Sequence, residues 1–320
     1  MRPPEFWSKD DGASRAIRAL LAPVSWAYGA SVRWKHDGAH PYRATAKVVC
    51  IGNLTAGGSG KTPIAIAVAR ALAAHHPVIL SRGYGGHTRG PVQVDLAHDT
   101  ARDVGDEPLL LARAAPVIVA RDRRAGAAFA DAHGAGIIVM DDGHQNFHLA
   151  KDLSIVVIDA ETGFGNGHVL PAGPLREPVA QGLARADAVV LVGDGAPDLG
   201  GFTGPILRAR LEPDDGHELT GEKVVAFAGI GRPDKFFDTL RHLGAQLIET
   251  REYADHHAYT ASEIARLKAK ARGARLVTTE KDYVRLTATE REGVEFLAVH
   301  ARFDDAIALA HLLDRIAPGL

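Results

Sequence analysis

The 320-residue chain has a single cysteine, Cys50, so it cannot form an internal disulfide or a zinc site built from several cysteines. One cysteine in an apolar stretch is typical of a buried residue in a protein of a reducing compartment. No apolar run reaches the ~18–20 residues that a membrane-spanning helix needs. Neither sign of charge is in excess, since 37 Lys and Arg stand against 39 Asp and Glu. A general nucleic-acid binder usually carries a basic excess, and we therefore expect no nucleic-acid partner.

Aromatic residues are also scarce, at 6%, yet all three tryptophans fall within the first 34 positions. They accompany an uncharged stretch, residues 19–32, that is flanked by Arg15, Arg18 and Arg33. The stretch is too short to span a bilayer, and the acidic residues before it argue against a signal peptide. Tryptophan beside arginine is typical of a helix lying in the interface of an anionic membrane. An ordinary helix packed on the protein is the alternative interpretation.

After residue 47 the pattern is that of an α/β protein. Continuous β-branched runs alternate with helical segments, which predicts a mostly parallel sheet flanked by helices on both faces. The expected strands are 48–52, 77–81, 116–120, 136–142, 153–159 and 187–193, with helices at 62–74, 108–114 and 121–133. A second, smaller α/β unit begins near residue 223, after a linker expected around 211–220. Its expected strands are 223–229, 245–250 and 274–279, and a capping box, Thr260 with Glu263, predicts the start of a helix.

A glycine-rich loop lies between the first strand and the first of these helices, and reads Gly52-Asn-Leu-Thr-Ala-Gly-Gly-Ser-Gly-Lys-Thr62. In that context its backbone N–H groups and the positive end of the helix predict a cradle for the phosphates of ATP. Lys61 would reach the β- and γ-phosphates, and the Thr62 hydroxyl would hold Mg²⁺. The strict pattern has glycine where this chain has Thr55, a departure for which the additional glycines would compensate. The expected nucleotide-binding residues are Thr55, Ala56, Gly57, Gly58, Ser59, Gly60, Lys61 and Thr62.

Two adjacent carboxylates, Asp141 and Asp142, end an apolar strand that is expected beside the loop. Such a strand end supplies the second half of a Mg-ATP site, so we expect one of the two to bind magnesium, directly or through water. A plain turn is the alternative. Guanine readers usually carry Asn-Lys-x-Asp after a later strand, whereas this chain has Thr278-Thr-Glu-Lys-Asp282, which does not fit.

These residues resemble one family, the tetraacyldisaccharide 4′-kinases of lipid A biosynthesis. The resemblance runs from the N-terminal segment to near Leu286 and includes blocks in the order of the family. One matching block is the phosphate loop, continued by Pro63. The other matching blocks are Pro23-Val-Ser-Trp-Ala-Tyr-Gly29, Ser81-Arg-Gly-Tyr-Gly-Gly86, Val104-Gly-Asp-Glu-Pro108, Asp141-Asp-Gly-His-Gln145, Pro171-Ala-Gly-Pro-Leu-Arg-Glu177, Ala254-Asp-His-His257 and Thr278-Thr-Glu-Lys-Asp282. His144 and Asn146 depart from the common form of the acidic block, and neither is assigned a role.

The resemblance implies an enzyme that moves the γ-phosphoryl of ATP to the 4′-hydroxyl of a tetraacylated glucosamine disaccharide 1-phosphate, giving lipid IVA. It implies a peripheral or monotopic place at the cytoplasmic face of the bacterial inner membrane, with contact through the N-terminal segment. Four parts are expected: a membrane-associated helical segment at 1–40, a phosphate-loop kinase domain at 41–212, a second α/β domain at 213–302, and a C-terminal helix within 303–320 that could pack back on the kinase domain.

The resemblance also implies roles for individual residues. Asp106 would be the general base, paired with His256 in preference to His257, and Lys61 would act on the transferring phosphoryl group. As an Asp–His pair drawn from two domains, Asp106 and His256 would meet only when the cleft closes. Without the resemblance, a helix cap and an ordinary loop histidine are the simpler interpretations.

Further cations and carboxylates lie near predicted strand ends or follow predicted loops. The candidates for substrate binding are Arg82, Arg121, Arg176 and Glu177. A solvated helix start is the alternative for Arg121, and locking of the Pro/Gly-rich loop before them is the alternative for Arg176 and Glu177. Glu280, Lys281 and Asp282 would contact nucleotide or brace the cleft. Two other classes stay open on the residues alone: a soluble ATP-dependent enzyme acting on a small metabolite, and a nucleotide-dependent switch protein without transfer chemistry.

Overall fold

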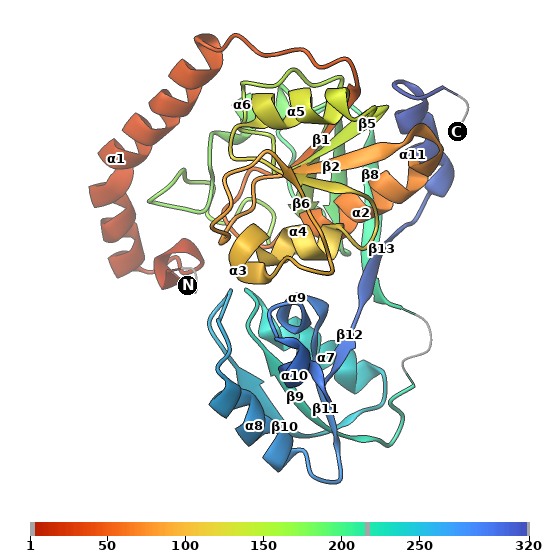
Figure 1. Ribbon diagram of the computed structural model, residues 1–320. Coiled ribbons are helices and arrows are strands. Elements are labelled where there is room, and N and C mark those ends of the chain that lie inside the picture. The colour runs from red at the N-terminus through yellow and green to blue at the C-terminus, as the bar shows by residue number, and fades with distance from the viewer. Residues whose placement is uncertain (1–3, 215–217, 319–320) are drawn as a thin grey trace.

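The computed structural model describes residues 4–214 and 218–318, which form a larger and a smaller lobe (Figure 1). The larger lobe is built on a nine-stranded sheet in the order β13-β8-β7-β6-β1-β5-β2-β4-β3. Only β13 on β8 and β3 on β4 are antiparallel, so the predicted α/β class with a mostly parallel sheet is confirmed. The strands are β1 (Lys47–Gly52), β2 (Pro77–Ser81), β3 (Val92–Gln93), β4 (Val117–Val119), β5 (Ile137–Asp141), β6 (Leu153–Asp159), β7 (Ala188–Val192), β8 (Ile206–Pro213) and β13 (Val299–Phe303).

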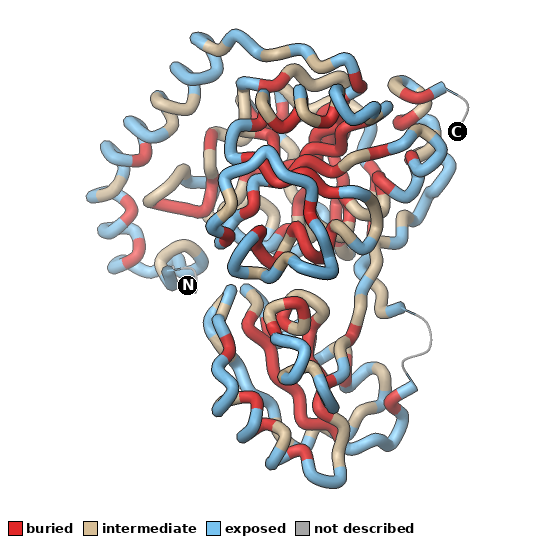
Figure 2. The backbone as a smooth tube through the Cα atoms, in the orientation of Figure 1, coloured by how far each residue is buried: buried red, intermediate tan, exposed pale blue. Residues whose placement is uncertain are grey.

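Helices cover both faces of this sheet, because its central strands are apolar on both sides. One face packs against α2 (Lys61–Ala71), α4 (Asp106–Leu111) and α11 (Ala306–Asp314). The other face packs against α5 (Arg123–Ala132) and α6 (Val179–Leu183). The short elements η2 (Ala73–His75) and α3 (Ala101–Val104) lie in connections. The fully buried residues follow the central strands of both lobes (Figure 2).

The smaller lobe repeats this plan on a parallel four-stranded sheet in the order β10-β9-β11-β12. Its helices α7 and α8 pack on opposite faces. The elements are β9 (Lys223–Ala228), α7 (Pro233–His242), β10 (Gln246–Glu252), α8 (Ala261–Lys270), β11 (Arg275–Thr279), α9 (Glu280–Tyr283), α10 (Ala288–Arg291) and β12 (Glu295–Leu297). The capping box expected at the start of α8 is present.

The chain crosses between the lobes in two places, at the ends of two strands that were not expected from the sequence. Strand β8 and strand β13 pair antiparallel at one edge of the large sheet, with Arg210 opposite Arg302. The boundaries expected at 212/213 and 302/303 fall within these two strands. The chain therefore enters the smaller lobe after β8 and has already returned to the large sheet at residue 299. Residues 215–217, part of the expected linker, lie outside the described residues.

The N-terminal segment forms η1 (Glu5–Trp7) and a long helix, α1 (Gly12–Asp37), along one side of the larger lobe (Figure 1). Residues 1–3 of this expected part and 319–320 of the C-terminal part lie outside the described residues. Most of α1 is exposed (Figure 2), and its buried residues are Ser14, Arg18 and Ser25. Among the described residues, no helix has the length and apolar character that crossing a membrane requires.

Candidate active site

The phosphate loop follows β1, at the centre of the large sheet, and ends where α2 begins. Gly57 and Gly60 have φ angles of 128° and 81°, values that glycine adopts without strain. Thr55 is not among the residues of positive φ; it bridges instead to Leu175, so the loop does not need a glycine there. Asn53 holds the loop from inside, donating to the Thr55 carbonyl at 2.8 Å and to Ser59 Oγ at 3.1 Å. The result is a glycine-rich turn at the start of an 11-residue helix, the geometry of an anion cradle.

Asp142 lies opposite the start of that helix. Its Oδ1 is 3.7 Å from Lys61 Nζ and accepts a hydrogen bond from Arg176 Nη1 at 2.7 Å. Burial raises the pKa of Asp142, but the charges of Lys61 and Arg176 lower it by more, which keeps the carboxylate ionised. Its φ is +49°, a left-handed conformation that costs free energy in a non-glycine residue. The backbone thus turns the Asp142 side chain toward the phosphate loop.

Asp141 is buried, and its Oδ1 has no hydrogen-bond partner. Burial, with the nearby charges of Glu107 and Asp142, raises its pKa. A buried carboxylate oxygen without a partner is unfavourable unless a cation satisfies it. No group of three or more His, Cys, Asp or Glu in the described part of the chain forms a metal cage. Mg²⁺, however, needs only one or two carboxylates besides phosphate and water oxygens, so Asp141, Asp142 and the Thr62 hydroxyl fit this ion.

Asp106 and His256 meet between the two lobes. Asp106 is the first residue of α4 in the larger lobe, and His256 follows β10 in the smaller one. His256 Nδ1 lies 2.9 Å from Asp106 Oδ2, so the pair expected from cleft closure is already formed. His256 has a φ of +58°; with His76 and Asp142 it makes up the non-glycine residues of positive φ in the described chain. His257 points elsewhere: its ring stacks on Tyr253 and its Nε2 lies 3.2 Å from Glu263.

Asp106 is held strongly ionised. Burial raises its pKa, but the hydrogen bond from His256 and the charges of Arg285 and Lys281 bring it well below the ordinary value. Arg285 donates to the same Oδ2 through Nε at 2.8 Å. Arg285 was not among the site residues expected from the sequence. The signal available was its spacing from Asp282, because residues three apart on a helical turn share a face.

Lys281 and Glu107 connect this pair to the phosphate site. Lys281 Nζ is 3.4 Å from His256 Nε2 and 3.4 Å from Glu107 Oε1. Glu107 in turn is close enough to raise the pKa of Asp141. Charged groups therefore extend from the Asp106–His256 pair, which spans the cleft, toward the Asp141–Asp142 strand end of the larger lobe.

Of the remaining residues expected to bind substrate, the two arginines lie at the surface and the glutamate is buried. Arg82 and Arg121 follow the neighbouring strands β2 and β4 at the same sheet edge; Arg82 is exposed, and Arg121 Nη2 donates to the Gly86 carbonyl at 3.1 Å. Glu177 is fully buried and pairs with Arg185 Nη2 at 2.6 Å and Gln145 Nε2 at 2.9 Å.

His144, which was assigned no role, lies beneath the loop. Its Nε2 is 2.9 Å from the Gly182 carbonyl, and burial first, then the charge of Lys151, lowers its pKa to about 3. The ring is therefore neutral. A Cβ on Gly52 would come within 2.5 Å of the His144 Cβ, so the close packing of this histidine requires glycine at the start of the loop.

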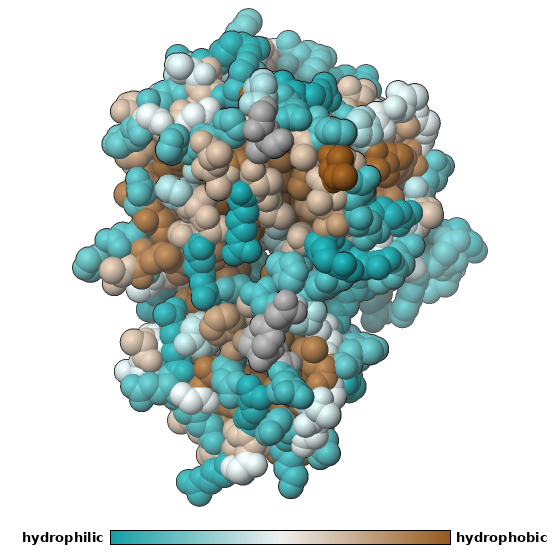
Figure 3. Space-filling model, turned by 90° about the vertical axis from the view of Figure 1, so that its right-hand side faces the viewer, coloured by the Kyte–Doolittle hydropathy of each residue, from teal (hydrophilic) through white to brown (hydrophobic). Residues whose placement is uncertain are grey.

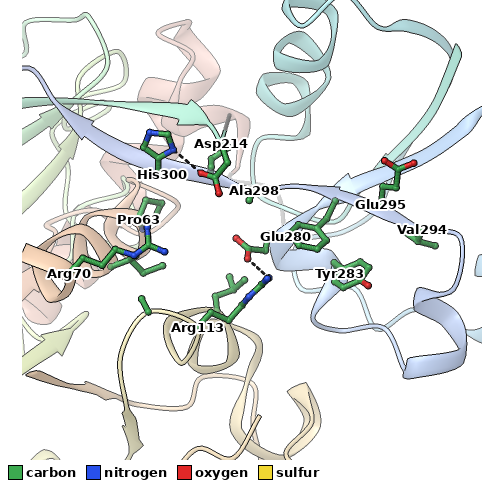
Figure 4. A pocket seen from close by; sticks show the side chains of 15 residues that line it. Pro63, Arg70, Arg113, Asp214, Glu280, Tyr283, Val294, Glu295, Ala298 and His300 are labelled. Carbon is green, nitrogen blue, oxygen red and sulfur yellow. Dashed lines mark hydrogen bonds and ion pairs between the residues drawn. The ribbon is translucent and has the colours of Figure 1, made fainter. Parts of the chain in front are cut away.

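A cavity of about 630 Å³ also lies between the lobes, beside α2 and α4 (Figure 4). In it Glu280 of the smaller lobe pairs with Arg113 of the larger, and His300 Nδ1 lies 2.8 Å from Asp214. Neither the phosphate-loop residues 55–62 nor Asp106 and His256 line this cavity. Glu280 thus braces the lobes, as Asp282 does through Arg285.

The sequence model of the tetraacyldisaccharide-1-P 4′-kinase family matches residues 17–317 of the chain. The chain belongs to this family. The tetraacyldisaccharide 4′-kinase of Paramagnetospirillum magneticum is 51% identical over 326 residues, covering 99% of each chain, and that of Rhodospirillum rubrum is 50% identical, covering 100% of this chain and 99% of the relative. The predicted family is therefore confirmed.

A solved structure of a family member is similar to this chain in fold. The crystal structure of LpxK from Aquifex aeolicus, described as an "apo" form in complex with ATP, matches with a TM-score of 0.78 and 27% identity. The match covers 94% of this chain and 99% of that one, so it includes both lobes. The fold is that of an ATP-binding kinase of this family.

Proposed function

We propose that the chain transfers the γ-phosphoryl group of Mg-ATP to the 4′-hydroxyl of a tetraacylated glucosamine disaccharide 1-phosphate, forming lipid IVA. The observation that carries the proposal is the meeting of Asp106 and His256 between lobes, connected through Lys281 and Glu107 to the Asp141–Asp142 strand end. A switch protein needs no such pair, since binding and release require only the loop and the metal ligands.

In this reaction the larger lobe binds the donor. Backbone N–H groups of residues 57–62 hold the β- and γ-phosphates, and Lys61 neutralises charge on the transferring group. Asp141, Asp142 and Thr62 would hold Mg²⁺, which when bound neutralises phosphate charge and orients the γ-phosphoryl group. Arg176 keeps Asp142 ionised and directed toward Lys61.

The Asp106–His256 pair orients the acceptor hydroxyl and takes its proton. Asp106 Oδ1 accepts a hydrogen bond from the Glu107 N–H at 3.0 Å and retains capacity for a second donor, while Oδ2 is engaged by His256 and Arg285. A carboxylate of low pKa is a weak base, which suits a loose transition state in which the hydroxyl loses its proton late, after P–O bond formation has made it acidic. Arg82 and Arg121 would pair with the 1-phosphate, a role supported by their exposure at the carboxyl ends of neighbouring strands.

Helix α1 is the candidate element for contact with the acyl chains of the substrate. Its exposed side chains include Leu20 at 80%, Trp26 at 77% and Trp34 at 77%, whereas its buried ones are polar, the reverse of a helix packed by its apolar face. A groove of about 930 Å³ between α1 and residues 167–181 is mostly apolar, with Arg15 and Arg33 on its lining. We propose that this groove receives acyl chains while α1 lies on the cytoplasmic face of the inner membrane.

Label transfer from γ-labelled Mg-ATP to the disaccharide lipid tests the reaction. We expect transfer by the wild-type chain and loss of at least about 100-fold in kcat for Asp106→Asn, because a general base contributes that much. A chain that hydrolyses ATP without labelling the lipid would contradict the proposed acceptor.

Vesicle flotation tests the membrane contact separately. We expect the wild-type chain to float with anionic vesicles. The triple variant Leu20→Glu, Trp26→Glu and Trp34→Glu should no longer float with them. The matched control carries Leu96→Glu, Ile248→Glu and Ile307→Glu, which are also exposed but lie away from α1, and should float like the wild type. Equal flotation of both variants would contradict the role of α1.

A further inference from the structure

Arg285 crosses from the smaller lobe to the larger one. It follows α9, and its side chain is only 6% exposed. Through Nε it donates to Asp106 Oδ2 at 2.8 Å, and through Nη1 to Asp282 Oδ1 at 2.8 Å and to the Gly229 carbonyl at 2.8 Å. One guanidinium thus joins α4 of the larger lobe to two separate segments of the smaller lobe. A planar, permanently charged fork is the side chain best suited to such a junction.

Its anchor in the smaller lobe is rigid. Asp282 is fully buried and accepts hydrogen bonds from the Gly229 N–H at 3.0 Å, Tyr259 Oη at 2.8 Å and Thr279 Oγ1 at 2.6 Å. Every oxygen of this carboxylate is therefore occupied, and Arg285 cannot swing away without leaving a buried charge unpaired. The position of the guanidinium is set by the core of the smaller lobe.

Both partners of Asp106 Oδ2, His256 and Arg285, belong to the smaller lobe. Separation of the lobes removes both together, and their approach restores both together. We infer that Arg285 is a positioning residue that couples closure of the cleft to the alignment of Asp106 with His256. The inference rests on the proposed role of the Asp106–His256 pair and adds a residue that neither contacts the nucleotide loop nor forms part of that pair.

The charges around Asp106 predict the direction in which replacing Arg285 shifts the pH dependence of the reaction. The groups that face it are His256 from the loop after β10, Lys281 and Arg285 from α9 and the residues after it, and Glu107 on its own helix. Arg285 is one of the cations that lower the pKa of Asp106. Loss of that charge raises the pKa of Asp106, so the acidic limb of the kcat–pH profile moves to higher pH.

The test compares Arg285→Gln, Arg285→Lys and a matched control, Arg113→Ala, in the label-transfer assay across pH. Arg113, which lies just after α4, also joins the two lobes, through Glu280 at the start of α9, but it makes no contact with Asp106. We expect Arg285→Gln to lower kcat about 10- to 100-fold, the cost of a misplaced catalytic group, with the KM for ATP nearly unchanged. Its acidic limb should rise by about one pH unit, the scale of one lost neighbouring charge. Arg285→Lys should lie between it and the wild type, and Arg113→Ala should keep the wild-type pH profile.

An acidic limb that does not move in Arg285→Gln, or an equal shift in Arg113→Ala, would overturn the inference. Thermal unfolding of each variant checks that it is folded. If Arg285→Gln does not fold, Arg285→Lys carries the test alone, and a wild-type kcat and pH profile for it would overturn the inference. Failure of the proposed function is distinct, because then Asp106→Asn or the wild-type chain itself gives the unexpected result.

Discussion

At the scale of single residues, two adjacent histidines in one loop have different surroundings. His256 has a left-handed backbone and contacts Asp106, whereas His257 stacks on Tyr253 and pairs with Glu263. Backbone strain of this kind persists where the surrounding structure enforces it, often at a site of function. Sequence alone favoured His256 only through the family resemblance, since both residues have the same chemistry.

This difference predicts unequal effects of the same substitution. His256→Asn should lower kcat for phosphoryl transfer by about 100-fold or more, because the base loses its oriented partner. His257→Asn should keep kcat close to the wild-type value and lower thermal stability slightly. Single-turnover transfer, which isolates the chemical step, measures the first effect. Equal loss in the two variants would show that the loop, and not the His256 contact, is needed.

Glu177 illustrates a residue whose expected substrate role the structure does not favour. Its carboxylate is fully buried and is engaged by Arg185 and Gln145. Glu177→Ala should lower the free energy of unfolding by about 3 kcal/mol, the lower end for breaking a buried ion pair, because Arg185 is 22% exposed and partly reaches water. Denaturant titration measures the change. Asp238→Ala, which breaks the exposed pair with Arg241, is the control and should leave stability unchanged within error.

At the scale of elements, the phosphate loop depends on the close packing of β1 against the segment after β5. Gly52 is the last residue of β1, and any side chain there would meet His144. Gly52→Ala should destabilise the fold by about 1–3 kcal/mol, the usual cost of overpacking, and should weaken ATP binding because the loop must shift. Gly12→Ala, at an open position, is the control. Thermal unfolding and ATP titration measure both, and wild-type ATP affinity in Gly52→Ala would contradict the link.

Most elements could be predicted from the sequence, because the central strands are continuous apolar runs and the helices between them carry clear starts. The strands β8 and β13 could not, for a physical reason. In β8 the residues Arg208, Arg210 and Glu212 alternate with apolar ones, as in a half-exposed strand, so no continuous run marks it. Its partner β13 is separated from it by the whole smaller lobe, a pairing that no local pattern encodes. For Arg285 only the spacing from Asp282 was a local signal, because its other acidic partner, Asp106, lies in the other lobe.

At the scale of the whole molecule, the account requires the lobes to close on each other. Figure 3 shows mainly hydrophilic side chains on the visible face where the two lobes meet. Between the lobes, Val284 of the smaller lobe packs into the apolar core of the larger one, and polar pairs surround that contact. Besides the Asp106 contacts, Arg232 and Lys235 of the smaller lobe pair with Asp159 and Glu161, which lie at the end of β6 and just beyond it in the larger lobe. Such partly exposed pairs are individually weak and are screened by salt.

These pairs predict a mild effect on closure. The double variant Arg232→Ala and Lys235→Ala should raise the KM for ATP about 2- to 5-fold, in keeping with the small free energy of exposed pairs, and should leave the pH profile unchanged. The wild-type KM should rise with salt more steeply than that of the variant. Initial rates at two salt concentrations measure this, and identical salt dependence would show that the pairs do not favour closure.

The central claim is that residues 57–62, the Asp141–Asp142 strand end and the Asp106–His256 pair make one site across two lobes. A crystal structure of the chain with Mg²⁺ and a non-hydrolysable ATP analogue tests it most directly. The account predicts β- and γ-phosphates on the amides of the loop, the metal on Thr62 and an Asp141 or Asp142 oxygen, and the terminal phosphate facing Asp106. A nucleotide bound elsewhere, or a terminal phosphate turned away from Asp106 and His256, would contradict it.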